Sequence, residues 1–498
     1  MSIATKPDWK SKVAELQLPT QAFINGKHVP AADGATFDCV SPVDGRVLTS
    51  VASCGAEDVD RAVKAARAAF DSGVWSGMSP EGRKNVLLSF ARNMMACAEE
   101  LALLETIDMG KPIKDSVSID IPLSANCIAW YAEAIDKIYD EVAPTGHSAF
   151  ATITREPMGV IGAVIPWNFP LLMAAWKLGP ALATGNCVVL KPAEQSPLTA
   201  LRLGQLAAEA GLPDGVLNIV PGFGETAGKA IGLHPDIDGV AFTGSAEIGK
   251  LFMQYSGQSN MKRVSLECGG KSPHIILADC HDLDAAARSA AFGIFFNQGE
   301  VCNAGSRLLV EESVKDEVLE KVMAWGKKLM PGDPLDPRTK MGAMVSSEQM
   351  QRVLGYIEKG QNEGAKLVMG GSRVMTESGG FYVEPTVFDG VDNKMTIAQE
   401  EIFGPVLSTI TFKDLDEALR IGNDTMYGLA AAVWTRDITK AHKAARSLRA
   451  GTVWVNCFDH GSLAVPFGGY KQSGFGRDKS LHAMDKYTEL KTTWIHLG

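Results

Sequence analysis

The sequence predicts an α/β protein in which a parallel, doubly wound sheet is followed by a second α/β unit. Short, continuous apolar runs alternate with helical segments along most of the chain, a pattern typical of parallel sheets that carry helices on both faces. The chain has 498 residues, more than one hydrophobic core usually holds, so we expect two or three domains.

The first strand-helix series begins after Arg155. Its strands are predicted at residues 159–165, 186–190, 216–220, 239–242 and 263–266. Helices are predicted over about 170–184 and 196–210, and from about Glu225 and Ser245. This alternation predicts a doubly wound, nucleotide-binding architecture whose ligands lie at the carboxyl ends of the strands.

A second series follows and predicts a second α/β domain. Its strands are predicted at residues 274–277, 306–310, 404–411, 429–434 and 452–455. The segment 488–495 alternates polar and apolar residues, as a half-exposed strand does, and could pair within the chain or across a subunit boundary. Glu267 falls at the seam between the two series, where pockets tend to form.

Composition and charge disfavour several classes of protein. The formal net charge of −10 argues against a nucleic-acid binder. The nine cysteines show no Cys-x-x-Cys spacing, so we expect neither disulfides nor a metal site. Unpaired thiols, and an N-terminus without the apolar core of a signal peptide, favour the cytoplasm. Residues 158–176 are uncharged, but Pro166 and Pro170 interrupt them, so we expect a strand, a turn and a buried helix instead of a membrane span.

Cys302 is the strongest candidate for a catalytic nucleophile. It lies in a stretch rich in Gly, Asn, Gln and Ser, between a predicted helix (285–296) and a predicted strand, and reacting groups tend to lie on such loops. Free cysteines are more often small buried apolar residues, so the setting carries the argument. A thiol is strongly nucleophilic near neutral pH once a base activates it, and Glu267 offers a carboxylate.

The ends of the predicted strands indicate a nucleotide site. The fourth strand ends in FTGS (242–245), where a serine-capped helix N-terminus offers N–H groups to a phosphate. Lys191 and Glu194 end the second strand and could bond ribose hydroxyls; a carboxylate there would repel a 2′-phosphate and so favours NAD over NADP. The glycine-rich turn 222–228 has a spacing one residue longer than the dinucleotide fingerprint and is equally well structural. Asn168, in an apolar turn, either bonds its own backbone or donates to a developing oxyanion.

Seven motifs, in order, resemble the NAD(P)-dependent aldehyde dehydrogenase superfamily over nearly the whole chain. They are PWNFP (166–170), KPAE (191–194), FTGS (242–245), ECGGK (267–271), GEVC (299–302), EEIFGP (400–405) and PFGG (466–469). Cys268 departs from the family pattern, which usually has leucine there. The resemblance implies an aldehyde-dehydrogenase-like fold with three parts. They are a Rossmann-type NAD-binding domain (1–134 and 155–266), an α/β catalytic domain (267–477) and a small β oligomerisation arm (135–154 and 478–498).

The resemblance also implies residue roles. Cys302 resembles the catalytic thiol, Glu267 the general base, and Asn168, with the backbone N–H of Cys302, the oxyanion hole. NAD is the implied cofactor, NADP being disfavoured, and a homodimer or homotetramer is the implied assembly. The expected cofactor-binding residues are Ile165, Pro166, Trp167, Lys191, Glu194, Gly224, Phe242, Thr243, Gly244, Ser245, Ile248, Gly269, Glu401 and Phe403.

Three stretches (105–112, 130–137 and 469–474) resemble bacterial dehydrogenases of polyamine and arginine catabolism that act on γ-glutamyl-γ-aminobutyraldehyde and 4-guanidinobutyraldehyde. We therefore expect the substrate to be an ω-amino, γ-glutamylamino or guanidino aldehyde, bound in an apolar tunnel with a carboxylate at its far end. The expected pocket residues are Asp120, Phe169, Trp176, Phe296, Val301, Asp459 and Phe467. Either aspartate could meet a substrate cation or simply cap a helix or loop.

Other functions remain open at this point. A broad-specificity aliphatic aldehyde dehydrogenase would carry the same motifs. In a CoA-acylating dehydrogenase, coenzyme A takes the acyl group, whereas Glu267 favours water. A cysteine hydrolase would pair Cys302 with a histidine, and none lies near it in sequence. A purely structural protein would be expected to have lost the thiol or the base, and both are present.

Overall fold

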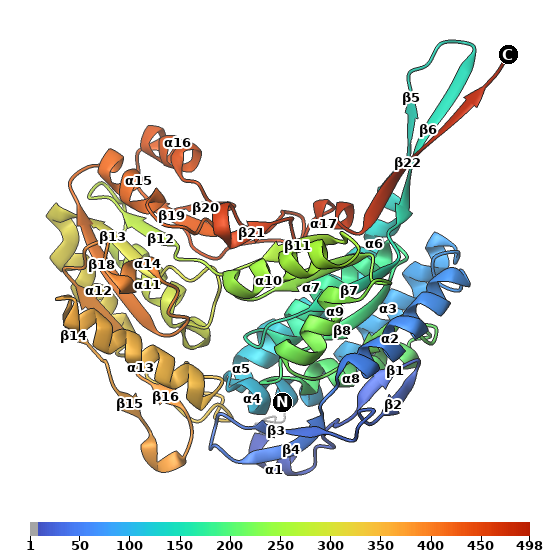
Figure 1. Ribbon diagram of the computed structural model, residues 1–498. Helices are drawn as coiled ribbons and strands as arrows, with labels where there is room; N and C mark the ends of the chain where they lie inside the picture. The colour runs from blue at the N-terminus through green and yellow to red at the C-terminus, as the bar shows by residue number, and fades with distance from the viewer. Residues whose placement is uncertain (1–7) are drawn as a thin grey trace, which may run out of the picture.

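The computed structural model describes residues 8–498, which form two lobes around separate sheets and an arm of β-strands that projects from one lobe (Figure 1). The first lobe holds an eight-stranded sheet in the order β2-β1-β9-β8-β7-β10-β11-β21. Its parallel centre consists of β7 (Val160–Val164), β8 (Cys187–Lys191), β9 (Leu217–Ile219), β10 (Gly239–Thr243) and β11 (Arg263–Glu267). All five strands of the predicted first series are thereby confirmed.

The edges of this sheet differ from the prediction of a parallel sheet. They are antiparallel and consist of β1 (Ala22–Ile24), β2 (Lys27–Val29) and β21 (Gly474–Phe475). The edge strands come from the two ends of the described chain and are two or three residues long. Such short segments carry too little periodic pattern to be recognised in a sequence.

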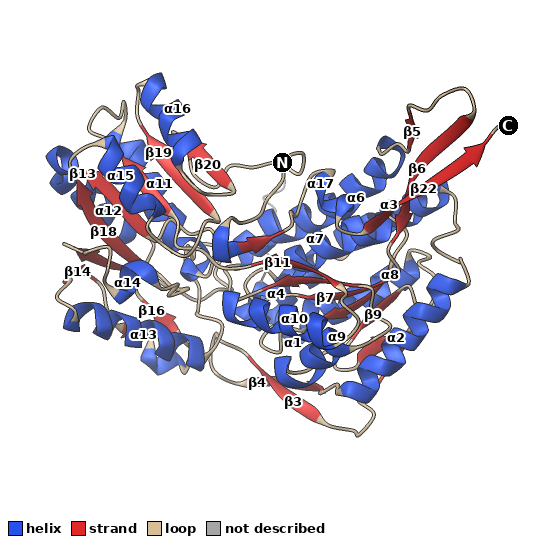
Figure 2. Cartoon of the chain, turned by 45° about the horizontal axis from the view of Figure 1, so that its top comes forward, coloured by secondary structure: helices blue, strands red, loops and turns tan. Residues whose placement is uncertain are grey.

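Helices cover both faces of the first sheet. One layer contains α3 (Pro80–Ala96), α4 (Ala98–Met109), α6 (Ile121–Ala134), α7 (Pro170–Ala183) and α8 (Leu198–Glu209). The other contains α2 (Ala56–Asp71), α9 (Lys229–Leu233) and α10 (Ala246–Gln258) (Figure 2). The uncharged stretch 158–176 is thus strand β7, a turn and the start of α7, as predicted. Between residues 8 and 498, no helix has the length and apolar character needed to cross a bilayer.

The second lobe holds a seven-stranded sheet in the order β14-β17-β18-β13-β12-β19-β20. The predicted strands are confirmed as β12 (Pro273–Ile276), β13 (Arg307–Glu311), β18 (Val406–Phe412), β19 (Ala430–Trp434) and β20 (Thr452–Val455). Two more strands extend one edge: β17 (Thr386–Asp389), parallel to β18, and β14 (Lys366–Met369), antiparallel to β17.

Alternate residues of these strands enter cores on opposite faces, as the pleat requires. Ile275 and Leu309 belong to the core under α13 (Ser347–Asn362) and α15 (Leu415–Asn423). Ile276 and Leu308 belong to the core under α11 (Leu283–Phe295) and α12 (Lys315–Gly326). Both faces of the second sheet are therefore buried.

The arm is a three-stranded antiparallel sheet of β5 (Glu141–Ala143), β6 (Ala149–Pro157) and β22 (Thr488–His496) (Figure 1). The half-exposed strand predicted at 488–495 pairs with β6, so it does pair within the chain. Residues 135–137 continue α6 as a 3₁₀ turn, and α17 (His482–Asp485) packs on α7 instead of joining the arm. Leu490 and Trp494 of β22 are 63% and 64% exposed.

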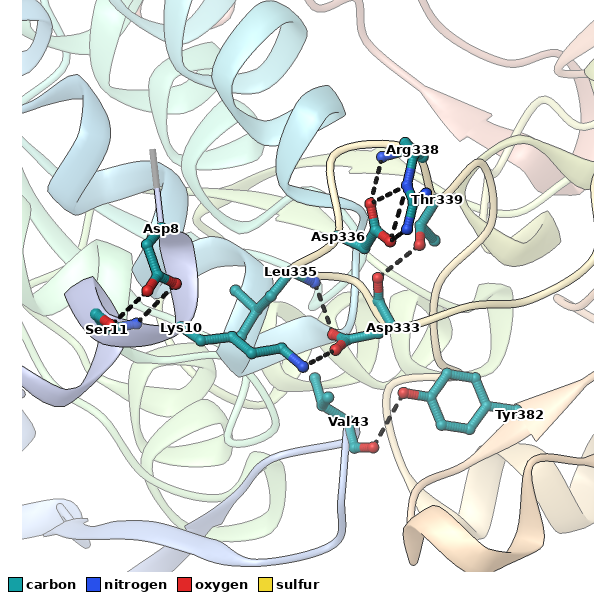
Figure 3. Close-up of polar contacts among 10 residues, drawn as sticks. All are labelled: Asp8, Lys10, Ser11, Val43, Asp333, Leu335, Asp336, Arg338, Thr339 and Tyr382. Atoms are coloured by element: carbon teal, nitrogen blue, oxygen red, sulfur yellow. Dashed lines mark hydrogen bonds and ion pairs between the residues drawn. The ribbon is translucent and has the colours of Figure 1, made fainter. Parts of the chain in front are cut away.

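The N-terminal segment of the first lobe also contacts the second lobe (Figure 3). Asp8 caps α1 (Trp9–Ala14) by accepting a hydrogen bond from the Ser11 backbone N–H, and Lys10 forms an ion pair with Asp333 (2.6 Å). Asp333 begins the loop segment 333–337. Nearby, Tyr382 donates a hydrogen bond to the Val43 carbonyl (3.0 Å). Exposed ion pairs contribute little stability, so these contacts mainly fix how the lobes meet.

Arg307, at the start of β13, is a buried arginine whose guanidinium needs several hydrogen-bond acceptors. Its guanidinium is fully buried and donates to the carbonyls of Lys271, Ile421 and Gly422 and to the Asn393 side chain, at 2.8–3.0 Å. These bonds tie the segment before β12 to the end of α15.

We expect Arg307→Met to lower the free energy of unfolding by about 3–5 kcal/mol, because several buried acceptors lose their donor at once. The denaturation midpoint in urea measures the loss. The matched control is Arg338→Met, since Arg338 is 83% exposed and pairs with Asp336 on the surface. A midpoint for Arg307→Met equal to that of the control would show that this network does not stabilise the lobe.

Candidate active site

A cavity of about 820 Å³ lies between the two lobes and contains all three residues expected to be catalytic. The first lobe contributes residues from the turn before α7, from α7 itself and from the ends of β10 and β11. The second lobe contributes Val301, Cys302 and Asn303, the segment around Glu401, and the loop that follows β20. Groups 35 residues apart in sequence, Glu267 and Cys302, thus share one solvent-accessible space.

The Cys302 loop follows a strained turn. In the 3₁₀ turn Phe296–Gly299, Asn297 and Gln298 have φ values of 47° and 58°, in the left-handed region that costs non-glycine residues free energy. Hydrogen bonds to both side chains fix the turn. Asn297 Nδ2 donates to the Asn168 carbonyl (3.1 Å) and to the Glu300 carbonyl (3.2 Å). Gln298 Oε1 accepts from the Gly342 N–H (2.9 Å). The backbone that carries the thiol is therefore positioned by both lobes.

The environment of Cys302 disfavours the thiolate form of its side chain. Burial raises the pKa of the thiol far above its usual range, and the negative charges of Glu401, Asp459 and Glu267 raise it further. The Asn303 backbone N–H acts in the opposite direction. Nucleophilic chemistry at this sulfur therefore needs a group that removes its proton.

Asn168 reaches the same loop from the first lobe. Its side chain is buried, and Nδ2 donates to the Glu300 carbonyl at 2.9 Å. The alternative in which Asn168 bonds its own turn is not what the structure shows, because the acceptor lies 132 residues away. The Asn168 amide therefore lies against the loop that carries Cys302.

Glu267 ends strand β11 and is 3% exposed. Neither carboxylate oxygen accepts a hydrogen bond from any residue in the described part of the chain. Burial raises the pKa of Glu267 well above its ordinary value, and nearby Asp478 raises it further; Lys177, Lys486 and Arg477 oppose the shift. A buried carboxyl with free oxygens and a raised pKa has the properties of a general base or acid near neutral pH.

Part of the expected cofactor site lines the same cavity. Ser245 caps α10, its Oγ accepting from the Ile248 N–H (3.2 Å), and the Gly270 N–H donates to Glu401 Oε1 (3.0 Å). The rings of Trp167 and Phe403 meet edge to face at 5.1 Å. The expected cofactor residues that line the cavity are Pro166, Trp167, Thr243, Gly244, Ser245, Gly269, Glu401 and Phe403.

The other expected cofactor residues lie outside the cavity lining. Lys191 Nζ bonds the Glu194 carboxylate (3.2 Å) and the Pro192 carbonyl (3.0 Å) at the carboxyl end of β8. Gly224 begins a single π-helical turn (Gly224–Gly228), while Ile248 is 41% exposed on α10. Ile165 and Phe242 are buried in the core of the first lobe.

The glycine-rich turn has a structural explanation of its own. Gly222 has a φ of 152°, and a Cβ atom there would lie 2.6 Å from the Cys54 carbonyl oxygen. A side chain is therefore excluded at Gly222 by its neighbours, whatever binds nearby.

Aromatic side chains form an apolar wall of the cavity. Trp176 and Phe467 meet at 5.3 Å, and Phe169 and Phe296 at 6.4 Å. Of the expected pocket residues, Phe169, Trp176, Phe296, Val301, Asp459 and Phe467 line the cavity.

Asp120 does not line the cavity, and its expected contact with a substrate cation is wrong. The carboxylate is completely buried 2.5 Å from Lys111 Nζ, which itself lies 3.9 Å from the centre of the Phe169 ring. Its neighbours Ile119 and Leu123 line the cavity instead. Asp120 occupies the N-cap position of α6 without making a cap bond, so the capping alternative is not observed either.

Asp459 does face the cavity. Its φ of 55° is left-handed, and Oδ1 accepts from Asn303 Nδ2 (2.8 Å), next to the nucleophile. Lys479, which lines the cavity, was not expected from the sequence, nor was the ion-pair cluster of buried Lys177 and Asp478 with partly buried Lys486. Lys479 belongs to no motif, and nothing in the sequence places it beside Trp176.

Comparison with known proteins gives consistent matches over almost the whole chain. The sequence model of the aldehyde dehydrogenase family matches residues 28–493. The NADP/NAD-dependent aldehyde dehydrogenase PuuC of Escherichia coli (strain K12) is 53% identical over 489 residues, 98% of each chain.

Two solved structures are similar in both sequence and shape. An indole-3-acetaldehyde dehydrogenase in complex with NAD+ has 61% identity and a TM-score of 0.98, covering 98% of this chain and 99% of the other. A γ-glutamyl-γ-aminobutyraldehyde dehydrogenase from Burkholderia cenocepacia J2315 has 60% identity and a TM-score of 0.97, covering 99% of both chains.

Proposed function

This chain belongs to the aldehyde dehydrogenase family, and from that premise we propose that Cys302, Glu267 and Asn168 oxidise an aldehyde to its carboxylic acid with NAD. The observation that carries the proposal is their meeting in one cavity between the lobes. The experiment that tests it is to measure NADH formation and acid product with a panel of aldehydes.

In the first half of the proposed reaction, Glu267, directly or through water, takes the proton of the Cys302 thiol. The sulfur then bonds to the carbonyl carbon, and the carbonyl π electrons move to the oxygen. Asn168 Nδ2 and the Cys302 N–H donate to this oxyanion. Bound NAD supplies the acceptor for the hydride that must leave this carbon.

In the second half, the acyl group remains on Cys302 as a thioester. Glu267, after releasing the thiol proton to solvent, takes a proton from a water molecule, whose oxygen bonds to the acyl carbon. The carbon–sulfur bond breaks, and the acid leaves. The acyl acceptor is thus water, for which the buried, unpaired carboxylate of Glu267 is suited. In a CoA-acylating enzyme the product would instead be an acyl-CoA.

The residues at the carboxyl ends of β8 and β10 fit a dinucleotide. The capped N-terminus of α10 opens on the cavity, and the buried Thr243 hydroxyl beside it has no partner among residues 8–498. Oriented N–H groups at a helix start suit a phosphate. In this proposal Lys191 and Glu194, which bond each other at the end of β8, meet the ribose hydroxyls, and the carboxylate disfavours a 2′-phosphate.

We predict that Glu194→Gln raises kcat/KM with NADP about tenfold and leaves NAD within about threefold, because the carboxylate that repels a 2′-phosphate is removed. Initial rates with both cofactors at one saturating aldehyde concentration measure the ratio. Glu209→Gln, an exposed change at the end of α8, serves as the control. An unchanged NADP-to-NAD ratio in Glu194→Gln would place the ribose elsewhere.

We propose an ω-amino, γ-glutamylamino or guanidino aldehyde as the substrate class. The aromatic walls suit an aliphatic chain, and Asp459 offers a carboxylate to a polar end. The relative from Burkholderia cenocepacia is named for such a substrate. The aromatic walls also fit an uncharged aldehyde, as in a broad-specificity aliphatic enzyme; equal kcat/KM for charged and uncharged aldehydes of one length would favour that alternative.

We propose that residues 1–134 and 155–266 form the NAD-binding domain, 267–477 the catalytic domain, and the arm within 135–154 and 478–498 an interface of a homodimer or homotetramer. The exposed apolar side chains of β22 and its position at the edge of the arm sheet support an interface there. The nine free cysteines fit the reducing conditions of the cytoplasm.

A further inference from the structure

Lys479 places an ammonium group beside two aromatic rings in the cavity between the lobes. It follows Asp478, which is fully buried between Lys177 and Lys486, so the backbone at this point is anchored. Lys479 itself has a left-handed φ of 58°. Its Nζ lies 5.3 Å from the centre of the Trp176 ring and 5.3 Å from that of Phe467.

The ammonium group has no anionic partner. Within residues 8–498, no carboxylate oxygen lies within 4.0 Å of Lys479 Nζ, and the group donates no hydrogen bond, whereas Lys177 and Lys486 are both paired. Burial lowers the pKa of Lys479, whereas Asp459, which lies in the same cavity and bonds Asn303, acts in the opposite direction and favours the charged form. Two aromatic faces stabilise a cation without satisfying its hydrogen-bond donors.

The position of this charge bears on which substrate end the cavity accepts. An ω-amino or guanidino aldehyde ends in a cation, which Lys479 repels. A γ-glutamylamino aldehyde ends in an α-amino acid, which has both an ammonium group and a carboxylate. The carboxylate supplies the acceptors that Lys479 lacks, and Asp459 in the same cavity adds a negative charge that an ammonium group tolerates.

We propose that Lys479 is a specificity-determining residue that binds a carboxylate at the distal end of the substrate, so that the enzyme prefers γ-glutamylamino aldehydes to aldehydes ending in a bare cation. This inference rests on the proposed function, since it assumes that an aldehyde enters this cavity. It adds a basic group to the carboxylate that was expected at the far end of the tunnel. Lys479 touches no reacting atom and has no role in the chemical steps proposed above.

The test compares wild type with Lys479→Met, which keeps an unbranched side chain against the rings and removes the charge. The substrates are γ-glutamyl-γ-aminobutyraldehyde, its analogue with a 4-aminobutanoyl group in place of the glutamyl group, 4-guanidinobutyraldehyde and hexanal. The analogue keeps the length and the ammonium group but lacks the carboxylate. We expect Lys479→Met to lower kcat/KM for the glutamyl substrate about 10- to 100-fold, chiefly through KM.

The same variant is expected to raise kcat/KM for the two purely cationic substrates several-fold and to leave hexanal within about threefold. Opposite effects on the two charge classes would not follow from a packing role. Lys479→Arg should restore the preference for the carboxylate. Lys328→Met is the control, since Lys328 also lies over a tryptophan ring (Trp325, 4.1 Å) but outside the cavity lining, and it should behave as wild type.

A wild-type enzyme that oxidises hexanal but handles the glutamyl substrate and its analogue equally would overturn the inference and leave the proposed function standing. Equal losses on all four substrates in Lys479→Met would also overturn it, because the lysine would then be structural. If wild type oxidised no aldehyde with NAD, the proposed function itself would fail and the inference with it.

Discussion

Cys302→Ala should lose aldehyde oxidation, with kcat lower by at least about 10⁴-fold, because no other group in the proposed mechanism can carry the acyl intermediate. The cavity should otherwise be preserved, since alanine is smaller than cysteine and the loop is held by Asn168, Asn297 and Gln298 through other atoms. NADH formation at saturating aldehyde measures the loss, and quenching of protein fluorescence by NAD checks that the cofactor still binds.

Cys268→Ala is the matched control for this variant. Cys268 is a second thiol that lines the cavity, directly after Glu267, and burial and the neighbouring carboxylates raise its pKa to about 12. Its sulfur would lie 3.0 Å from a Cβ atom on Gly249, so it packs against α10. We expect it to keep most of the activity. A steady-state rate near wild type in Cys302→Ala would show that Cys302 is not the nucleophile. A comparable loss of activity in Cys268→Ala would contradict the assignment as well.

Glu267→Gln is expected to separate the two halves of the reaction. The first turnover should persist as a burst of NADH close to one per active site, although slower than in wild type, because water or buffer can still take the thiol proton. Release of the acid should fall by about 10²–10⁴-fold, since the amide cannot accept a proton from the attacking water. Stopped-flow recording of NADH, followed into the steady state, shows both phases in one trace.

The pH dependence of the steady-state rate gives an independent check on Glu267. A general base works when it is deprotonated, so the rate of acid release should rise with pH through the pKa of this carboxyl. Burial and Asp478 raise that pKa, so the rising limb in wild type should lie well above the pKa of an ordinary glutamate. Glutamine does not titrate, and the limb should vanish in Glu267→Gln. If the rate of acid release showed the same pH dependence in wild type and in Glu267→Gln, the rising limb would belong to a group other than Glu267.

The positions of the strands along the chain were the most predictable part of the fold. Runs such as 187–190 and 240–242 are apolar at every position because both faces of their sheets are covered, and helix-strand alternation is a local signal. The antiparallel edges were not predictable: β1 and β21 lie hundreds of residues apart, and each is too short to show a period. Helices α2 to α6, within the first 134 residues, were likewise not assigned.

In the candidate site, residues that lie in sequence motifs were predictable, whereas residues whose role depends on distant neighbours were not. Cys302, Glu267 and Asn168 stand in recognisable motifs, and the fold brings them into one cavity. The expectation that Asp120 lines the cavity was wrong because its carboxylate pairs with Lys111. This ion pair forms where α4 and α6 pack together, which the sequence does not show. Lys479 was missed for the converse reason, since a lysine in no motif acquires its setting from Trp176 and Phe467, about 300 and 12 residues away.

Mass spectrometry of the trapped intermediate shows whether Cys302 carries the acyl group that Glu267 helps to release. Glu267→Gln protein is mixed with excess NAD and hexanal, quenched in acid within the burst, and analysed intact and after digestion. The account predicts a mass increase of one hexanoyl group per chain, confined to the peptide that contains Cys302 and absent from Cys302→Ala. A burst of NADH without a covalent adduct, or an adduct on the peptide of Cys268, would contradict it.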